Sequence, residues 1–170
     1  MTTGAVQPPF QPLMPISWSE LIVAGQANLA PQPPAAQPAP ATIRRVISTA
    51  YYAVFHALAA SNADVLIGSA HDRLTADAWV RTYRGLNHNQ ARSQLQQNRT
   101  SFSANVRVFA DLLRYLQNER HNADYNPQAT FTAQTAATWL NKADIVITNF
   151  LQASQGERAA VAIFTLVRTR

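Results

Sequence analysis

Proline is confined almost entirely to one end of the chain. Nine of the ten prolines lie within residues 1–40, and the remaining one is Pro127. Because proline lacks an amide donor and clashes with the preceding helical turn, the run PQPPAAQPAP at 31–40 excludes a helix or a central strand there. From Ala41 onward no such run interrupts the chain. The sequence therefore predicts a proline-rich N-terminal arm over 1–40 and a folded domain over 41–170.

Apolar residues recur at helical spacing on both sides of this boundary. In the arm, WSELIVAGQANLA predicts one short helix, whose apolar stripe must pack against the rest of the protein. The expected helices span 17–29, 41–62, 72–92, 101–124, 132–153 and 157–168. No segment shows the alternating pattern of a strand.

These patterns predict an all-α fold. We expect an up-and-down helical bundle of about four to five helices with an N-terminal helical arm. The two long helices at 41–62 and 101–124 are expected to be antiparallel at its centre.

Composition narrows the class of protein. The chain has 170 residues, of which 47% are hydrophobic, and this is enough for one domain with a core. It has no cysteine, which excludes disulfides and thiolate metal sites. No apolar run approaches the length of a membrane span, and the N-terminus lacks the basic start and apolar core of a signal peptide. We therefore expect a cytoplasmic protein that does not enter a membrane.

The basic residues are almost all arginine. Of the 14 basic residues only Lys142 is a lysine, and the formal net charge is +5. Arginine binds phosphate bidentately and stacks on bases, so this bias favours RNA or a nucleotide as partner, although a GC-rich genome gives the same bias. Five arginines lie between 78 and 110, where no acidic residue occurs: Arg81, Arg84, Arg92, Arg99 and Arg107. Wherever it folds, this stretch makes a positive surface.

Polar side chains interrupt the apolar helix at 41–62. Tyr52 and His56 are four residues apart and share one helical face with Arg45 and Thr49. Because apolar residues occupy nearly every other side, we expect this helix to be central and mostly buried. A buried phenol and a buried imidazole need hydrogen-bond partners. Either His56 is a core histidine satisfied by a tyrosine or a backbone carbonyl, or it belongs to a site.

A second polar cluster lies at the end of the helix at 101–124. Arg120 stands on the apolar stripe, where a guanidinium is costly without a partner, and Asp124 is one candidate for that partner. A neighbouring stripe of the same helix carries Arg114, Asn118, His121 and Tyr125. The helix stops at DYNP because Pro127 disfavours helical geometry in the residue before it. These side chains gather opposite His56 and Tyr52, which indicates a candidate site.

Other chemistries have weaker support in the sequence. It contains no HExxH zinc motif, no glycine-rich phosphate loop and no GxSxG nucleophile turn. A metal site made of His56, His121 and Asp124 stays open as an alternative, but we expect neither a metal nor another cofactor.

Two stretches taken together resemble the HEPN superfamily, and in particular its small prokaryotic members. RRVISTAYYAVFHALA at 44–59 matches an S-x-x-YYA-x-FH helix, and ERHNADYNP at 119–127 matches an R-x-x-ADY helix end. The resemblance also takes in the arm helix, the segment YRGLNHNQAR and the last two helices. It implies a HEPN-like bundle of about four to five helices over 41–170 that is often a homodimer.

The resemblance implies a function as well. Many HEPN proteins are metal-independent ribonucleases with an R-x(4–6)-H motif, in which the Arg and His of two protomers meet across the dimer. Arg120 matches the arginine, and His121 matches the polar residue that often follows it. Tyr125 stands where the histidine is expected, and the shifted spacing Arg114-x6-His121 also fits formally.

Such a ribonuclease, which would act on RNA as a toxin or defence component, needs particular side chains. A base must activate the ribose 2′-OH, and a cation must stabilise the phosphate in the transition state. We expect Arg120 to supply the charge and His121 or His56 to exchange the proton. Tyr125 completes the expected catalytic set, although a phenol is a poor base at neutral pH. The residues expected to contact the substrate are Tyr52, Asn118, Arg114 and Asp124.

Two alternatives to a ribonuclease stay open. In the same superfamily, HEPN proteins pair with small nucleotidyltransferases as toxin–antitoxin modules, and a tyrosine near the motif receives nucleotides. Tyr125 is the matching tyrosine, so one alternative is a non-catalytic nucleotide- or partner-binding module. In the other, the polar residues only tie the two central helices together.

Overall fold

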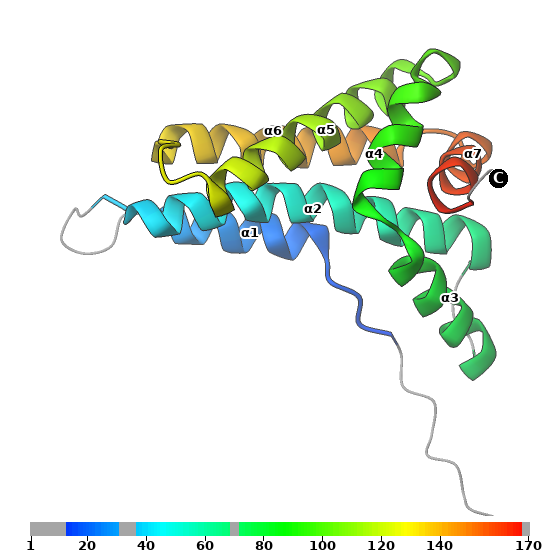
Figure 1. The fold of residues 1–170 in the computed structure, drawn as a ribbon. Helices are drawn as coiled ribbons and strands as arrows, with labels where there is room; N and C mark the ends of the chain where they lie inside the picture. Colours follow the sequence, from blue (N-terminus) through cyan, green and yellow to red (C-terminus); the bar gives the residue numbers. More distant parts are fainter. Residues whose placement is uncertain (1–12, 31–36, 69–71, 168–170) are drawn as a thin grey trace, which may run out of the picture.

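The computed structural model describes residues 13–30, 37–68 and 72–167. Within these ranges all regular secondary structure is helical, which confirms the expected all-α fold (Figure 1). The elements in chain order are α1 (Trp18–Leu29), α2 (Pro40–Ile67), α3 (Arg73–Gly85), α4 (His88–Gln97), the 3-10 helix η1 (Arg99–Ser101), α5 (Ala104–Tyr125), α6 (Ala133–Leu151) and α7 (Gln155–Leu166).

Helix α2 forms the centre of the fold. It begins at Pro40, whose missing amide costs nothing in the first helical turn, and ends before Gly68, which takes a φ of 78°. It packs against α1, α3, α5, α6 and α7. Its fully buried side chains include Ile47, Tyr51 and Leu58. The prediction of a central, mostly buried helix is confirmed, although the helix continues to Ile67 rather than ending at 62.

Helix α5 runs antiparallel to α2, as expected. In Figure 1 the last turn of α5 lies beside the first turn of α2, and α6 returns alongside both. Arg44 at the start of α2 donates to the backbone carbonyls of Ala123 at 2.8 Å and Asn126 at 3.0 Å, at the end of α5. Phe109 stacks on Phe150 with ring centroids 4.1 Å apart, which joins α5 to α6 within the core.

The arm helix α1 packs on α2 and α6, as its apolar stripe predicted. The Ser17 hydroxyl caps it by accepting from the amide of Glu20. Ile22 is buried in the common core. Gly25 lies so close to α6 that an added Cβ would be 2.8 Å from Cδ2 of Leu140. The glycine therefore sets how closely the two helices approach.

The predicted helix over 72–92 is wrong, because the chain forms two helices there. Helix α3 ends at Gly85, and Leu86 has the extended dihedrals φ −66° and ψ 122°. The Asn87 side chain then caps α4 by accepting from the amides of Asn89 and Gln90, each at 3.0 Å. Helix α4 turns away from α3 and packs on α5 and α7 (Figure 1). The chain from Pro40 onward thus has one α-helix more than predicted.

Helix α7 crosses the far end of α2 (Figure 1). The side-chain amide of Asn62 donates to the hydroxyl of Thr165 at 2.9 Å, and both side chains are fully buried. Glu157 at the start of α7 accepts from the amide of Ser103, which precedes α5. Two polar contacts therefore fix α7 against the bundle.

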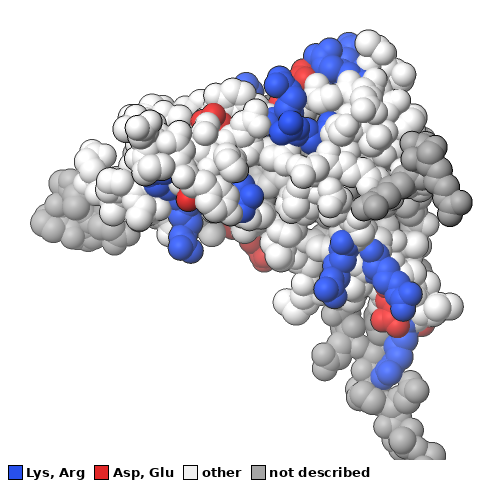
Figure 2. All heavy atoms as spheres, in the orientation of Figure 1, with Lys and Arg blue, Asp and Glu red and all other residues white. Residues whose placement is uncertain are grey.

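The basic side chains are spread over several elements. Figure 2 shows them over the upper end of the molecule, where α4 and α5 meet, and along α3. One arginine of the 78–110 stretch is neutralised, because Arg99 Nη2 lies 2.6 Å from Oδ2 of Asp111.

No helix in the described ranges is long and apolar enough to cross a membrane.

Candidate functional site

The antiparallel pairing of α2 and α5 brings the two polar clusters together. Arg120 on α5 faces Tyr52 on α2, and its guanidinium carbon lies 5.6 Å from the centre of that ring. The same carbon lies 5.8 Å from the ring centre of Tyr125. Aromatic faces attract a cation, so the two rings offset part of the cost of removing the guanidinium from water.

Arg120 has one anionic neighbour. Its Nε lies 2.7 Å from Oδ2 of Asp124, and 28% of its side chain is exposed. The Nε–H is not aimed at this oxygen, so the buried Nε has no hydrogen bond among the described residues. Asp124 itself accepts a hydrogen bond of 2.7 Å from the hydroxyl of Ser48. Arg120 is thus held by charge and by rings, while its buried Nε is left without a hydrogen bond to the described chain.

An open cavity of about 480 Å³ lies on one side of Arg120, between α2, α4 and α5. It is lined by Tyr51, His88, Asn89, Arg92, Gln117, Asn118, Arg120 and His121. We call it the Arg120 cavity. Two guanidinium groups line it, and none of its lining residues is acidic, so it is suited to an anion. Arg92 reaches the side-chain oxygen of Asn118 at 3.4 Å, which joins α4 to α5 across the cavity.

A second hollow lies on the other side of Arg120, where α2 begins and α5 ends. It has a volume of about 510 Å³ and is lined by Ala41, Arg44, Arg45, Ser48, Thr49, Tyr52, Ala123 and Asp124. Tyr52 and Asp124 both contact Arg120, so these side chains separate this hollow from the Arg120 cavity. The sequence predicted that Arg45, Thr49 and Tyr52 share one face of α2, and this face lines the hollow.

His56 has a tyrosine partner, as one reading of the sequence predicted. The partner is Tyr83 on α3, whose hydroxyl lies 2.6 Å from Nδ1 of His56. Tyr52 only stacks on the imidazole, with ring centroids 6.2 Å apart. Burial lowers the pKa of His56, and the nearby His88 lowers it further. His56 is therefore a satisfied histidine behind the site and does not line the Arg120 cavity.

His88 takes the place at the cavity that His56 was expected to fill. Its Nδ1 lies 2.5 Å from the hydroxyl of Tyr51, and its ring stacks on Phe55 with centroids 3.9 Å apart. Partial burial lowers the pKa of His88, and the positive charge of Arg120 lowers it further. Burial raises the pKa of the Tyr51 phenol, so its hydroxyl keeps its proton. At neutral pH the His88 imidazole is therefore uncharged and able to accept a proton.

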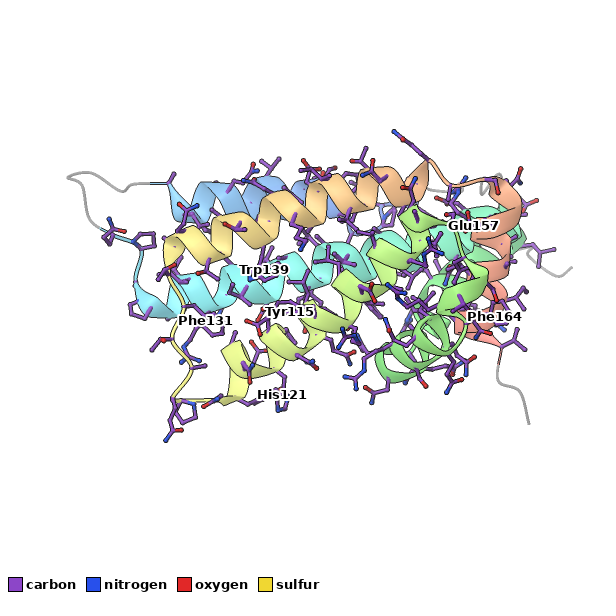
Figure 3. All side chains as sticks on the ribbon, turned by 90° about the horizontal axis from the view of Figure 1, so that it is seen from above. Tyr115, His121, Phe131, Trp139, Glu157 and Phe164 are labelled. Carbon is purple, nitrogen blue, oxygen red and sulfur yellow. The ribbon has the colours of Figure 1, made fainter. Side chains whose placement is uncertain are left out.

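The structure brings most of the predicted site residues together. Arg120, His121 and Asn118 line the Arg120 cavity. Tyr125 is 64% exposed and lies against both Arg120 and His121, with its ring centroid 5.2 Å from that of His121. Figure 3 shows His121 near the end of α5, on the side away from α6. Arg114 is not part of this group, because it lines a different cavity between α5 and α6.

Three site-related residues were missed in the sequence, namely His88, Arg92 and Arg44. A single helix over 72–92 would make His88 and Arg92 face in the wrong direction. In the structure a new helix begins after the cap at Asn87, and this changes the direction in which both side chains face. Arg44 also donates to the carbonyl oxygens of Asn122 and Ala129, and its role depends on where α5 ends. Gly85 followed by Asn87 is the one signal that marks the helix break.

The described residues form no metal centre. No group of three or more His, Asp or Glu side chains in this part of the chain could hold a metal ion. His56, His121 and Asp124, which the sequence left open as a metal site, therefore do not form one.

No family model, no curated protein and no solved structure matches the chain.

Proposed function

We propose that this chain is a HEPN-like protein that cleaves RNA without a metal ion, with Arg120 binding the scissile phosphate. The observation that carries the proposal is the Arg120 cavity. There the buried Nε of Arg120 lacks a hydrogen bond among the described residues, and Arg92, His88 and His121 line the same space. Cations and imidazoles in one open cavity are the groups that phosphodiester transfer needs. The resemblance of both sequence stretches to the HEPN superfamily points to the same chemistry.

The reaction follows from the side chains present. The ribose 2′-oxygen attacks the adjacent phosphorus as its proton passes to an imidazole, and the bond from phosphorus to the 5′-oxygen breaks. The products are a 2′,3′-cyclic phosphate and a free 5′-hydroxyl. Arg120 and Arg92 stabilise the negative charge that builds up on the phosphate oxygens.

His88 is the candidate base, and His121 is the candidate acid. When Nδ1–H of His88 donates to the Tyr51 oxygen, Nε2 is left as the acceptor for the 2′-OH proton. The imidazolium that forms lies near Arg120, and this repulsion favours release of the proton. His121 is exposed at the cavity and can deliver a proton to the leaving 5′-oxygen. His88 thus takes over the role for which the sequence suggested His56.

The test is cleavage of end-labelled single-stranded RNA by pure protein in the presence of EDTA. We expect products that end in 2′,3′-cyclic phosphate. Arg120→Ala should lower kcat/KM by about a hundredfold or more, and His88→Ala and His121→Ala should each lower it by a similar factor. The matched control is Arg81→Ala, which removes an exposed arginine of α3. Intact RNA, or equal cleavage by Arg120→Ala with an unchanged circular dichroism spectrum, would contradict the proposal.

A second candidate function is supported by Tyr125. Its phenol is 64% exposed beside Arg120, at the position where the ribonuclease motif has histidine. In this alternative the chain is a nucleotide- or partner-binding module of a small nucleotidyltransferase. A nucleotide bound at Arg120 should raise the melting temperature of the wild type and leave that of Arg120→Ala unchanged. The alternative is abandoned when no nucleotide raises the melting temperature and no nucleotidyltransferase co-purifies with the chain.

A further inference from the structure

A third cavity, on a different face of α5, combines aromatic rings with positive charge. It has a volume of about 530 Å³ and lies between η1, α5 and α6. Tyr115 and Trp139 line it, with ring centroids 4.4 Å apart and planes inclined by 34°. Figure 3 shows both side chains in the space between α5 and α6, on the side of α5 away from His121. We call this cavity the α5–α6 groove.

The aromatic pair in the α5–α6 groove is open to solvent. Tyr115 is 42% exposed and lines the groove. Trp139 is half-buried and packs at the edge of the core. One ring is therefore anchored by the core while the other presents a free edge and face. A pair of this kind offers a rigid surface on which a planar group can stack.

The charges around the rings are mostly positive. Arg114 and Lys142 are exposed at the groove, and Lys142 Nζ lies 5.3 Å from the centre of the Trp139 ring. The single carboxylate of the groove, Asp111, is occupied by Arg99 through an ion pair of 2.6 Å. Three cations thus face one carboxylate. Among the described residues neither Arg114 nor Lys142 forms an ion pair, although the charge of Arg114 is near enough to lower the pKa of Asp111.

We propose that the α5–α6 groove binds single-stranded nucleic acid, with a base stacked on Tyr115 and Trp139 and the flanking phosphates on Arg114 and Lys142. Stacking rings interleaved with cations are what a flexible strand of alternating bases and phosphates requires. Its groups lie on another face of α5 from the Arg120 cavity, and no residue lines both. The proposal therefore does not depend on cleavage at Arg120.

A binding experiment tests this proposal directly. The probes are an 8-nucleotide 2′-O-methyl RNA, which lacks the 2′-hydroxyl needed for cleavage, and a DNA strand of the same sequence. Affinity is measured by fluorescence anisotropy at several salt concentrations, and quenching of tryptophan emission reports stacking. We expect Tyr115→Ala to weaken binding about tenfold, because stacking of one base contributes about that much. Arg114→Gln and Lys142→Gln should each reduce the slope of log affinity against log salt concentration by about one unit.

The controls separate the groove from other sites and from loss of fold. Trp139→Phe keeps a ring at the core edge and should abolish the oligonucleotide-dependent quenching, whereas Arg120→Ala should keep it. Heparin, a polyanion without bases, should compete for the cations without quenching Trp139. The proposal is overturned when Tyr115→Ala and Lys142→Gln bind like the wild type, or when the quenching persists in Trp139→Phe.

Discussion

The Nε of Arg120 lies 2.7 Å from Oδ2 of Asp124, one helical turn further along α5. Asp124 is fixed in this place by the hydroxyl of Ser48 on α2. The carboxylate therefore has two effects on Arg120: it orients the guanidinium, and it competes with any other anion for the same charge. About a quarter of each side chain is exposed, so solvent weakens the attraction without removing it.

Replacing Asp124 with asparagine should strengthen anion binding at Arg120. The amide oxygen can still accept from Ser48, while the competing negative charge is lost. For a partly exposed pair we expect a gain of about 0.5–1 kcal/mol, or about a two- to fivefold lower Kd for a non-cleavable oligonucleotide. Isothermal titration calorimetry measures it. Ser48→Ala is the control, because it removes the hydrogen bond and keeps the charge. A higher Kd in Asp124→Asn would mean that orientation outweighs competition.

Acidification should destabilise the protein through His56 and His88. The folded state lowers the pKa of both imidazoles from the ordinary value of 6.5. The unfolded chain therefore binds more protons as the pH falls below about 6.5, and the free energy of unfolding falls with it. Above that value this contribution to stability is fully present.

Urea denaturation between pH 7.5 and 5.5 measures this dependence. The double variant His56→Gln/His88→Gln keeps every carboxylate of the chain. The slope of its unfolding free energy against pH therefore gives the contribution of the other groups. We expect the wild type to lose stability more steeply than the double variant over this range. Equal slopes would show that neither histidine is held in its neutral form by the fold.

Arg44 should be the residue that fixes the end of α5. Its guanidinium donates to the backbone carbonyls of Asn122, Ala123, Asn126 and Ala129, where the helix ends and the chain turns toward α6. We expect Arg44→Ala to lower the free energy of unfolding by about 2–3 kcal/mol, because charged donors are lost from several carbonyls at once. The control is Arg45→Ala, which removes the neighbouring, exposed arginine. Chemical denaturation should show that its free energy of unfolding differs from that of the wild type by no more than about 0.5 kcal/mol. Equal losses of unfolding free energy in both variants would show that Arg44 does not specifically stabilise the end of α5.

Much of the fold was predictable because the signals that determine it are local. The proline distribution and the apolar spacing predicted six helices over 17–168, and five of them occur with ends shifted by a few residues. The break between α3 and α4 was missed because apolar spacing continues across it. There a glycine and a capping asparagine outweigh the pattern, and Leu86 is buried in an extended conformation.

The candidate site was predictable only where a residue violated its own helix pattern. Arg120 was found because a guanidinium stood on an apolar stripe, and its contacts to Asp124 and Tyr52 follow from helix spacing and from the antiparallel pairing. His88 reaches the site only because α4 begins beside α2, where the His88 ring meets the hydroxyl of Tyr51. That contact depends on tertiary packing, and no local pattern in the sequence encodes it.

The spacing between α1 and α6 should depend on Gly25. A Cβ at this position would lie 2.8 Å from Cδ2 of Leu140, which is fully buried in the core. Overpacking costs about 1–3 kcal/mol, whereas the higher helix propensity of alanine regains up to about 1 kcal/mol. We therefore expect Gly25→Ala to lower the free energy of unfolding by about 1 kcal/mol. Gly156 in α7 has open space around its Cβ position, so Gly156→Ala should be neutral or stabilising in thermal denaturation. A stabilised Gly25→Ala would show that α1 shifts freely on the bundle.

A dimer that shares the Arg120 cavity should form more strongly with phosphate present. The HEPN resemblance implies that two copies of this site meet, and two guanidinium groups near a twofold axis repel each other. Asp124 offsets only part of this charge, so an anion bound between the protomers should shift the equilibrium toward the dimer. Sedimentation velocity at several protein concentrations, with and without phosphate, measures the shift. In Arg120→Ala the repulsion and the anion site are both lost, so the dependence on phosphate should disappear. A monomer under every condition would remove the shared site and, with it, most of the support for the ribonuclease.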